Sequence, residues 1–215
     1  MFEHLAYAGT VFAGFFSIMN PISGISIFLT LTQGEKGNEI KKIALHSVIT
    51  AFVIVVIFSV AGNLLLKFFG ISHTALRLAG GILVGLIGYE MLQGKQSSVS
   101  KPSKDTIEKT IQEEGSVAIA PLGTPLLAGP AVIITAMNFA SGGFFNLFIT
   151  IITFALLCVI TYYVFIWGKK IKRMLGVNAL KVVTKMMGLI LVFIGTQMFI
   201  DGVYSAIQKF PHASL

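Results

Sequence analysis

The chain has 215 residues, of which 55% are hydrophobic and only 12% charged, and its mean hydropathy is +0.86. A soluble domain needs more polar side chains than this to cover its surface, so the composition indicates a membrane protein. The net charge of +7 does not indicate nucleic-acid binding, because the basic residues gather in short loops between apolar stretches. The single cysteine, Cys158, has no partner for a disulfide or a thiolate metal site.

Six membrane-spanning helices are predicted from the apolar stretches. A helix needs about 20 apolar residues to cross the hydrocarbon core. The uncharged run 116–168 is too long for one helix and predicts two, with a break within residues 138–146, where Ser141-Gly142-Gly143 supplies turn chemistry. The first run has no basic residues before it, unlike a cleaved signal peptide, and is expected to be retained. The predicted spans cover residues 5–31, 48–66, 76–92, the two parts of 116–168, and 180–206.

The basic residues predict how the chain is oriented in the membrane. With six spans, 13 of the 16 Lys and Arg residues fall in loops on one side, and Lys67, Arg77 and Lys209 fall on the other. The positive-inside bias places the richer side in the cytoplasm. We therefore expect a multi-pass protein of the plasma membrane with both termini outside the cytoplasm. Residues 95–115 mix lysine, serine and acidic side chains and are expected to form a solvated cytoplasmic linker.

The third and sixth spans share a glycine pattern. In each, two glycines stand seven residues apart and a methionine follows three residues later: Gly81, Gly88 and Met91, then Gly188, Gly195 and Met198. Each half would hold three spans, an odd number, so the second copy would enter the membrane from the opposite side. The sequence thus predicts an all-α fold of two inverted three-helix repeats, residues 1–94 and 116–215. Chance similarity between glycine-bearing apolar helices is the alternative.

The first span of each half contains a proline motif near its middle. Asn20-Pro21 and the stretch Pro-Leu-Gly-Thr-Pro-Leu-Leu-Ala-Gly-Pro at 121–130 should each break a helix, because proline lacks an N–H and clashes with the preceding turn. The first and fourth spans are therefore predicted to be broken. Free backbone groups persist in lipid only inside protein or beside a wet cavity. The amide end of a half-helix suits a carboxylate, and the carbonyl end suits an ammonium or a cation.

The residues around these motifs are the predicted substrate-binding site. They are Ser17, Asn20, Pro21, Ser23, Gly24, Thr124, Pro125, Gly129 and Pro130. A plain packing kink is the alternative for either motif. Glu90 and Asp201 are candidates for coupling to a proton or a cation if they lie deep in the membrane, where a charge costs at least about 2.5–3.5 kcal/mol.

Other activities find less support in the sequence. The chain offers neither a His-Glu-x-x-His metal motif nor a Gly-x-Ser-x-Gly turn, so we expect it not to be an enzyme and to need no metal or cofactor. No nucleotide-binding signature is present, and ATP is not expected to drive it directly.

The Asn-Pro motif, the span-four proline motif and the pattern Leu78-Ala-Gly-Gly-Ile-Leu resemble those of the MarC family of integral membrane proteins, over essentially the whole chain. This resemblance implies a relation to SnatA-type transporters of small neutral amino acids such as glycine and alanine, and to LysE-like exporters. It also implies that residues 17–24 and 121–130 line the substrate path.

We therefore expect a secondary transporter of the glycine and alanine class, coupled to H⁺ or Na⁺, that works by alternating access about a midplane site. A LysE-like exporter or a channel for another small metabolite is the alternative. The expected partners are the amino acid, the coupling cation and membrane lipid, with a homo-oligomer as a further candidate and no nucleic acid.

Overall fold

The computed structural model describes residues 2–94 and 127–209, and within these ranges the chain forms helices joined by short turns. The helices are α1 (Phe2–Met19), α2 (Pro21–Leu31), α3 (Gly37–Phe68), α4 (His73–Leu92), α6 (Pro130–Ala140), α7 (Phe144–Ile166) and α8 (Gly168–Lys209). Five segments are long and apolar enough to cross a membrane, with α1 and α2 together forming the first. The all-α, multi-pass architecture is thereby confirmed.

A sixth span is not established. Helix α6 is apolar but has only 11 residues. The linker predicted at 95–115 and the first part of the predicted fourth span lie outside the described residues. The predicted break between the fourth and fifth spans is confirmed, because α6 ends at Ala140 and α7 begins at Phe144.

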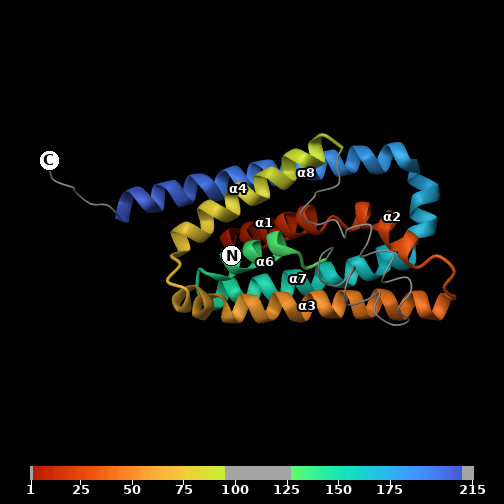
Figure 1. The fold of residues 1–215 in the computed structure, drawn as a ribbon, viewed down its shortest axis with the longest axis horizontal. Helices are drawn as coiled ribbons and strands as arrows, with labels where there is room; N and C mark the ends of the chain where they lie inside the picture. Colours follow the sequence, from red (N-terminus) through yellow and green to blue (C-terminus); the bar gives the residue numbers. More distant parts are fainter. Residues whose placement is uncertain (1, 95–126, 210–215) are drawn as a thin grey trace.

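The helices form three layers (Figure 1). Helices α4 and α8 cross on one side of the bundle, α3 and α7 pair on the other, and α1, α2 and α6 lie between the two pairs. Helices α1 and α2 contact both α7 and α8, while α6 contacts both α3 and α4. The break at Asn20-Pro21 and the start of α6 at Pro130 therefore lie in the central layer.

Glycines bring the backbones of α4 and α8 together. A Cβ added to Gly81 would lie 2.7 Å from the carbonyl oxygen of Gly195, and one added to Gly195 would lie 2.7 Å from that of Gly81. Gly88 and Gly188 face each other in the same way, at 2.7 and 2.8 Å. Small residues are what allow membrane helices to pack this closely. The order of the contacts shows that the two helices run antiparallel.

Two glycines with positive φ end helical segments, as glycine commonly does at the C-terminal end of a helix. Gly70 has φ 67°, and the next helix begins after Ser72, whose Oγ accepts a hydrogen bond of 3.1 Å from the N–H of Ala75. Gly176 has φ 72° and ψ 166° and interrupts α8. It separates a short basic segment from the spanning part, Asn178–Gln208. Both glycines thus mark the entry into the last helix of a predicted half.

Helix α3 begins earlier than the predicted span, at Gly37 rather than near residue 48. Its first turns carry Lys41 and Lys42, and the Nζ of Lys42 lies 2.9 Å from a carboxylate oxygen of Glu39. A helix of 32 residues is about 48 Å long, whereas the hydrocarbon core is about 30 Å thick. The apolar stretch 48–66 therefore marked only a part of α3, one whose length matches the hydrocarbon core.

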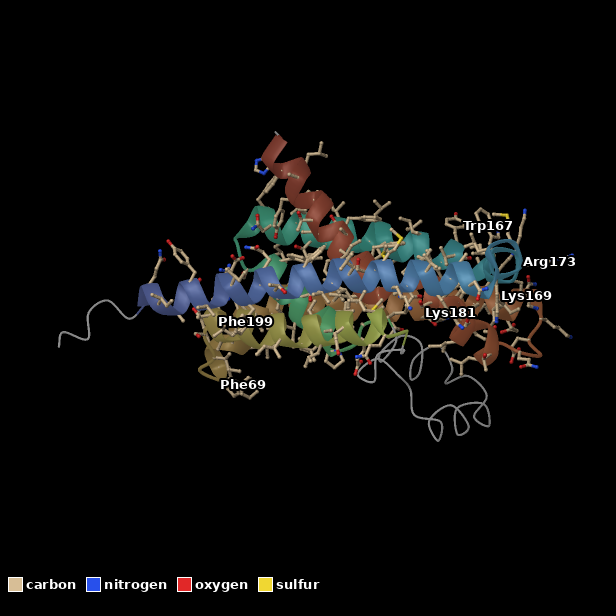
Figure 2. The ribbon with its side chains drawn as sticks, turned by 90° about the horizontal axis from the view of Figure 1, so that it is seen from above. Phe69, Trp167, Lys169, Arg173, Lys181 and Phe199 are labelled. Carbon is tan, nitrogen blue, oxygen red and sulfur yellow. The ribbon has the colours of Figure 1, made fainter. Side chains whose placement is uncertain are left out.

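Basic side chains gather at one end of the bundle. Figure 1 shows the α2–α3 turn and the α7–α8 junction at one end, and the α3–α4 turn, the α6–α7 turn and the end of α8 at the other. Lys169, Arg173 and Lys181 lie at the first end beside Trp167, and Phe69 lies at the opposite end (Figure 2). Between the ends, many large apolar side chains are exposed, as expected of a surface that faces lipid.

Candidate functional site

The first span is interrupted at Asn20. Its φ of 40° and ψ of 63° are left-handed, and within the described ranges no other non-glycine residue has a positive φ. Asparagine tolerates this conformation better than most residues. Its Oδ1 accepts a 3.3 Å hydrogen bond from the N–H of Ser23 and so caps α2. Pro21 occupies the first position of α2, where no N–H is needed. The interruption agrees with the prediction from the Asn-Pro motif.

The interruption leaves backbone carbonyl groups without their helical partners. Pro21 has no N–H to donate to the carbonyl of Ser17. The N–H of Ser23 is donated to the side chain of Asn20 instead of the carbonyl of Met19. Asn20 takes part in two backbone hydrogen bonds across the break. Its N–H donates to the oxygen of Phe16 at 2.9 Å, and its oxygen accepts from the N–H of Gly24 at 3.1 Å. The end of α1 therefore presents acceptors at the negative end of a helix dipole.

Side-chain hydrogen bonds hold the interrupted span against α8. Ser23 and Thr184 share a short hydrogen bond between their hydroxyl oxygens. Thr184 donates its own proton to the carbonyl of Leu180 at 2.8 Å, so Ser23 is the donor in the shared bond. The hydroxyl of Ser17 donates to the sulfur of Met187 at 3.6 Å. Both sides of the break thus contact the same helix through polar groups.

The space around the break is narrow. A Cβ added to Gly24 would lie 3.3 Å from the ring of Phe165, which stacks on Phe28 with ring centroids 4.5 Å apart. Four of the predicted site residues are buried here: Ser17, Asn20, Pro21 and Gly24. Ser23 is half-buried. A guest at this position would have to be small.

Helix α6 begins at the second proline motif. Gly129 is its extended N-cap residue, and Pro130 is its first residue. The first backbone bond of the helix runs from the N–H of Ile133 to the oxygen of Gly129, at 3.1 Å. The N–H groups of Ala131 and Val132 precede that bond, and both residues are buried. Gly129 is buried and Pro130 is exposed, whereas Thr124 and Pro125 lie outside the described residues.

The break at Asn20 and the start of α6 lie in the same central layer. The hydroxyl of Tyr7 donates to the carbonyl of Phe139 at 2.5 Å, and a Cβ added to Gly14 would lie 3.1 Å from the Phe139 ring. Figure 1 shows the gap between α1 and α2 and the start of α6 at a similar position along the bundle. One buried cluster includes residues before the Asn-Pro motif and residues within or just after the second motif: Ile18, Met19, Leu127, Ala128, Ala131 and Val132. The carbonyl end of α1 and the amide end of α6 therefore flank the same region.

Glu90 lies at the level of this region. It is half-buried on α4, one residue before Met91. A Cβ added to Gly188 would lie 2.8 Å from the Cβ of Met91. Gly188 follows Met187, the residue that contacts Ser17 at the break. Of the two acids predicted as candidates for coupling, Glu90 is therefore the one that lies near the level of the break.

Asp201 lies far from the break. It is exposed, and its carboxylate accepts a 2.9 Å hydrogen bond from the amide of Gln197. At 1.5 Å per residue, it stands about 21 Å along α8 from Met187. The structure therefore does not bring Asp201 together with the other predicted site residues.

Several side chains that contact the break, or that bear buried hydroxyl groups, were not predicted from the sequence. Thr184 and Met187 contact the break from α8, and no local signal set them apart from other residues of a spanning helix. In the part of the chain that the structure describes, the buried hydroxyl groups of Thr135 and Ser59 have no hydrogen-bond partner. Thr135 lies on α6, just over one turn beyond its start. Its hydroxyl is a further candidate contact for a polar guest.

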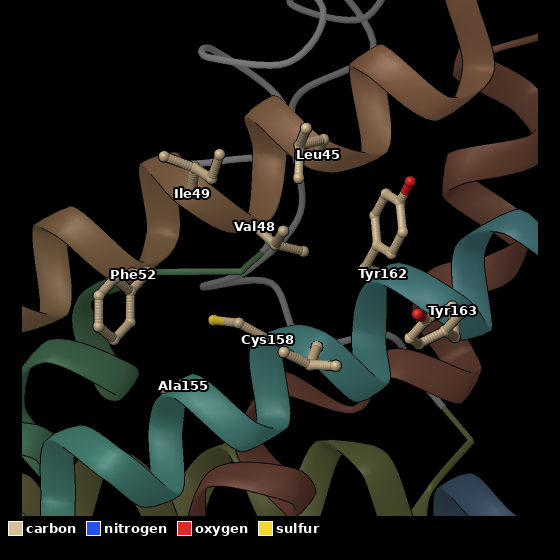
Figure 3. Close-up of a pocket in the computed structure, with 9 residues that line it drawn as sticks. Leu45, Val48, Ile49, Phe52, Ala155, Cys158, Tyr162 and Tyr163 are labelled. Atoms are coloured by element: carbon tan, nitrogen blue, oxygen red, sulfur yellow. The ribbon is translucent and has the colours of Figure 1, made fainter. Parts of the chain in front are cut away.

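A cavity of about 360 Å³ lies elsewhere, between α3 and α7 (Figure 3). Apolar and aromatic side chains of the two helices line it, and none of the predicted site residues is among them. This cavity is therefore distinct from the region around the broken span.

Together these features describe a multi-pass helical membrane protein with a buried break in its first span. The sequence profile described as "MarC family integral membrane protein" matches residues 5–207, and the chain belongs to this family. It is 36% identical to the UPF0056 membrane protein YvbG of Bacillus subtilis, over 87% of this chain and 90% of the relative. A UPF0056 membrane protein of Methanocaldococcus jannaschii is also 36% identical, over 94% and 98% of the two chains. The UPF0056 inner membrane protein MarC of Escherichia coli is 28% identical over 90% and 92%. No solved structure matches the chain.

Proposed function

We propose that this protein is a secondary transporter of small neutral amino acids of the glycine and alanine class. The observation that carries the proposal is the buried break at Asn20, which lies in the same layer as the start of α6. The end of α1 offers carbonyl groups to the ammonium of an amino acid, and the start of α6 offers amide groups to its carboxylate. A zwitterion with a small side chain fits this chemistry and the narrow space beside Phe165.

An inverted repeat of residues 1–94 and 116–215, joined by a linker at 95–115, gives such a site its symmetry. The glycine contacts support this repeat. When Gly81 is aligned with Gly188 and Gly88 with Gly195, the contact between Gly81 and Gly195 corresponds to the contact between Gly188 and Gly88. Reciprocal contacts of this kind are what a two-fold axis produces. The pairing of α3 with α7 and of α4 with α8 follows the same exchange. Rocking of one half against the other would expose the central layer to each side in turn.

The bonds from Ser23 to Thr184 and from Ser17 to Met187 close the described state around the break. A substrate would replace these contacts with its own polar groups as α8 moves away from α1 and α2. Glu90, at the same level, is the proposed site of coupling to H⁺ or Na⁺. We also propose that the protein forms a homo-oligomer. We expect it to have no enzymatic activity and to need no cofactor.

We further propose that the protein resides in the plasma membrane with both termini outside the cytoplasm. The gathering of basic residues at the end that carries the α2–α3 turn and the α7–α8 junction supports this orientation. The Escherichia coli relative is described as an inner membrane protein, which agrees with this location.

The test is uptake of labelled glycine by the purified protein in liposomes, under imposed pH or Na⁺ gradients. We expect saturable uptake that depends on one of the two gradients and is inhibited by unlabelled alanine. Empty liposomes provide the control. Gradient-independent, non-saturable flux would overturn the proposal. Saturable efflux of another metabolite without competition by glycine would favour a LysE-like exporter or a channel for that metabolite.

A further inference from the structure

The cavity between α3 and α7 is an apolar groove whose edge residues are exposed on the surface of the bundle. Leu45, Ile49, Val159 and Tyr163 at its edges are each between 44 and 53% exposed. The remaining lining residues are Val48, Phe52, Ala155, Cys158 and Tyr162. Figure 3 shows Phe52 and Ala155 at one end of the groove and Leu45, Tyr162 and Tyr163 toward the other. The lining follows helical spacing on both helices, so the groove runs along their axes.

The groove has a length suited to one leaflet. Seven residues separate Leu45 from Phe52, which is about 10 Å along the helix. Half of the hydrocarbon core is about 15 Å thick. The groove therefore covers much of the depth that an acyl chain occupies in one leaflet.

One end of the groove leads to cationic and aromatic groups. Lys41 is exposed one turn before Leu45, on the same stripe of α3. On the opposite helix, Tyr163 packs against Trp167 with ring centroids 5.7 Å apart. Lys169 and Lys170 follow Trp167 in the first turn of α8 and are exposed. Figure 2 shows Trp167 and Lys169 together at the basic end of the molecule.

We propose that this groove is a binding site for an anionic glycerophospholipid. One acyl chain lies between α3 and α7, and the phosphate lies between Lys41 on one side and Lys169 and Lys170 on the other. Tyr162, Tyr163 and Trp167 supply donors at the level of the ester groups, where aromatic residues are favoured in membranes. The lysines favour an anionic head group over a zwitterionic one, because an anionic head group has no quaternary ammonium that the lysines would repel. This site is independent of the proposed transport site.

Trp167 provides the readout, because it is the single tryptophan of the chain. The purified full-length protein is placed in bilayers of phosphatidylcholine that contain increasing amounts of phosphatidylglycerol with brominated acyl chains. Bromine quenches tryptophan fluorescence on contact, so the quenching curve gives the relative affinity. Brominated phosphatidylcholine serves as the zwitterionic comparison. We expect phosphatidylglycerol to be preferred by about tenfold or more.

Two sets of variants test the two parts of the site, the cationic end and the apolar groove. Lys41→Gln and Lys170→Gln should each weaken the preference for phosphatidylglycerol by about fivefold, while Lys67→Gln, at the opposite end, should change it by less than about twofold. Val159→Phe should fill the groove and weaken binding, whereas Leu156→Phe, on the same helix but outside the lining, should not. Thermal unfolding of each variant checks that it is folded.

Four outcomes would overturn the proposal. The first is equal quenching by the two lipids, and the second is an effect of Lys67→Gln as large as that of Lys41→Gln. The third is full competition by glycerol phosphate without acyl chains, which would indicate a phosphate site that does not use the groove. The fourth is protection of the groove by a second copy of the chain, seen as cross-linking between copies at position 159 of a Val159→Cys variant in a Cys158→Ala background, where Cys158→Ala alone gives no cross-link.

Discussion

Asn20 combines two roles that can be separated by substitution. It adopts a left-handed conformation and its side chain caps α2 through Ser23. Asn20→Ala removes the cap and places a less tolerant residue at φ 40°, which we expect to destabilise the protein by about 1–3 kcal/mol. Asn20→Gly accepts the backbone conformation and should cost only a few tenths of a kcal/mol. Thermal unfolding of the purified variants measures the difference.

The same pair of variants tests the proposed role of the Asn20 side chain in transport. If that side chain contacts the substrate, both variants should lose most of their glycine uptake, although only the alanine variant is clearly destabilised. Wild-type uptake by Asn20→Gly would limit the residue to a structural role in the break.

Glu90 and Asp201 should differ in their importance for coupling. Glu90 lies at the level of the break, whereas Asp201 is exposed about 21 Å further along α8 than Met187. Glu90→Gln should abolish uptake driven by an ion gradient while keeping exchange of labelled for unlabelled glycine. Asp201→Asn should leave both nearly unchanged. Gradient-driven uptake by Glu90→Gln at the wild-type rate would remove Glu90 from the coupling mechanism.

At the level of elements, the contact between α4 and α8 depends on glycines that face the opposing backbone. In Gly195→Ala, the new Cβ would lie 2.5 Å from the backbone nitrogen of Gly85 and 2.7 Å from the carbonyl of Gly81. Because backbone atoms cannot rotate away, we expect a loss of about 1–3 kcal/mol or more.

Gly85→Ala is the matched control on the partner helix. A Cβ added to Gly85 meets no atom within 4 Å, and alanine is the better helix former by up to about 1 kcal/mol. This variant should be as stable as the wild type or slightly more so. Equal unfolding temperatures for the two alanine variants would contradict the role of close backbone contact.

The limits of α3 and α6 show what apolar patterning can and cannot predict for single elements. The apolar run of the second span gave the part of α3 inside the lipid but not its basic first turns, because a helix does not end where hydrophobicity ends. Helix α6 starts at Pro130, the last residue of the second proline motif, since the first turn of a helix needs no N–H at that position. The predicted break of the fourth span within residues 121–130 falls mostly outside the described residues.

At the level of the whole molecule, the proposed orientation predicts which ends of the bundle reagents can reach. In a Cys158→Ala background, His73→Cys should react with a membrane-impermeant maleimide in intact cells. Lys36→Cys, at the basic end, should react only after the membrane is permeabilised. Both positions are exposed in the structure. The opposite pattern would invert the orientation, and equal labelling in intact cells would show that the two turns do not lie on opposite sides.

The amino-acid sequence by itself determined the class of this protein, most of its spans, its basic end and the position of the break at Asn20. Each of these follows from local chemistry: lipid requires a continuous run of apolar residues, and proline removes a backbone donor wherever it stands. Only the tertiary structure decided which groups meet. The hydroxyl of Thr184 beside Ser23, the depth that separates Glu90 from Asp201, and the groove between α3 and α7 depend on how distant helices cross, because side-chain packing between them fixes contacts that no local pattern encodes.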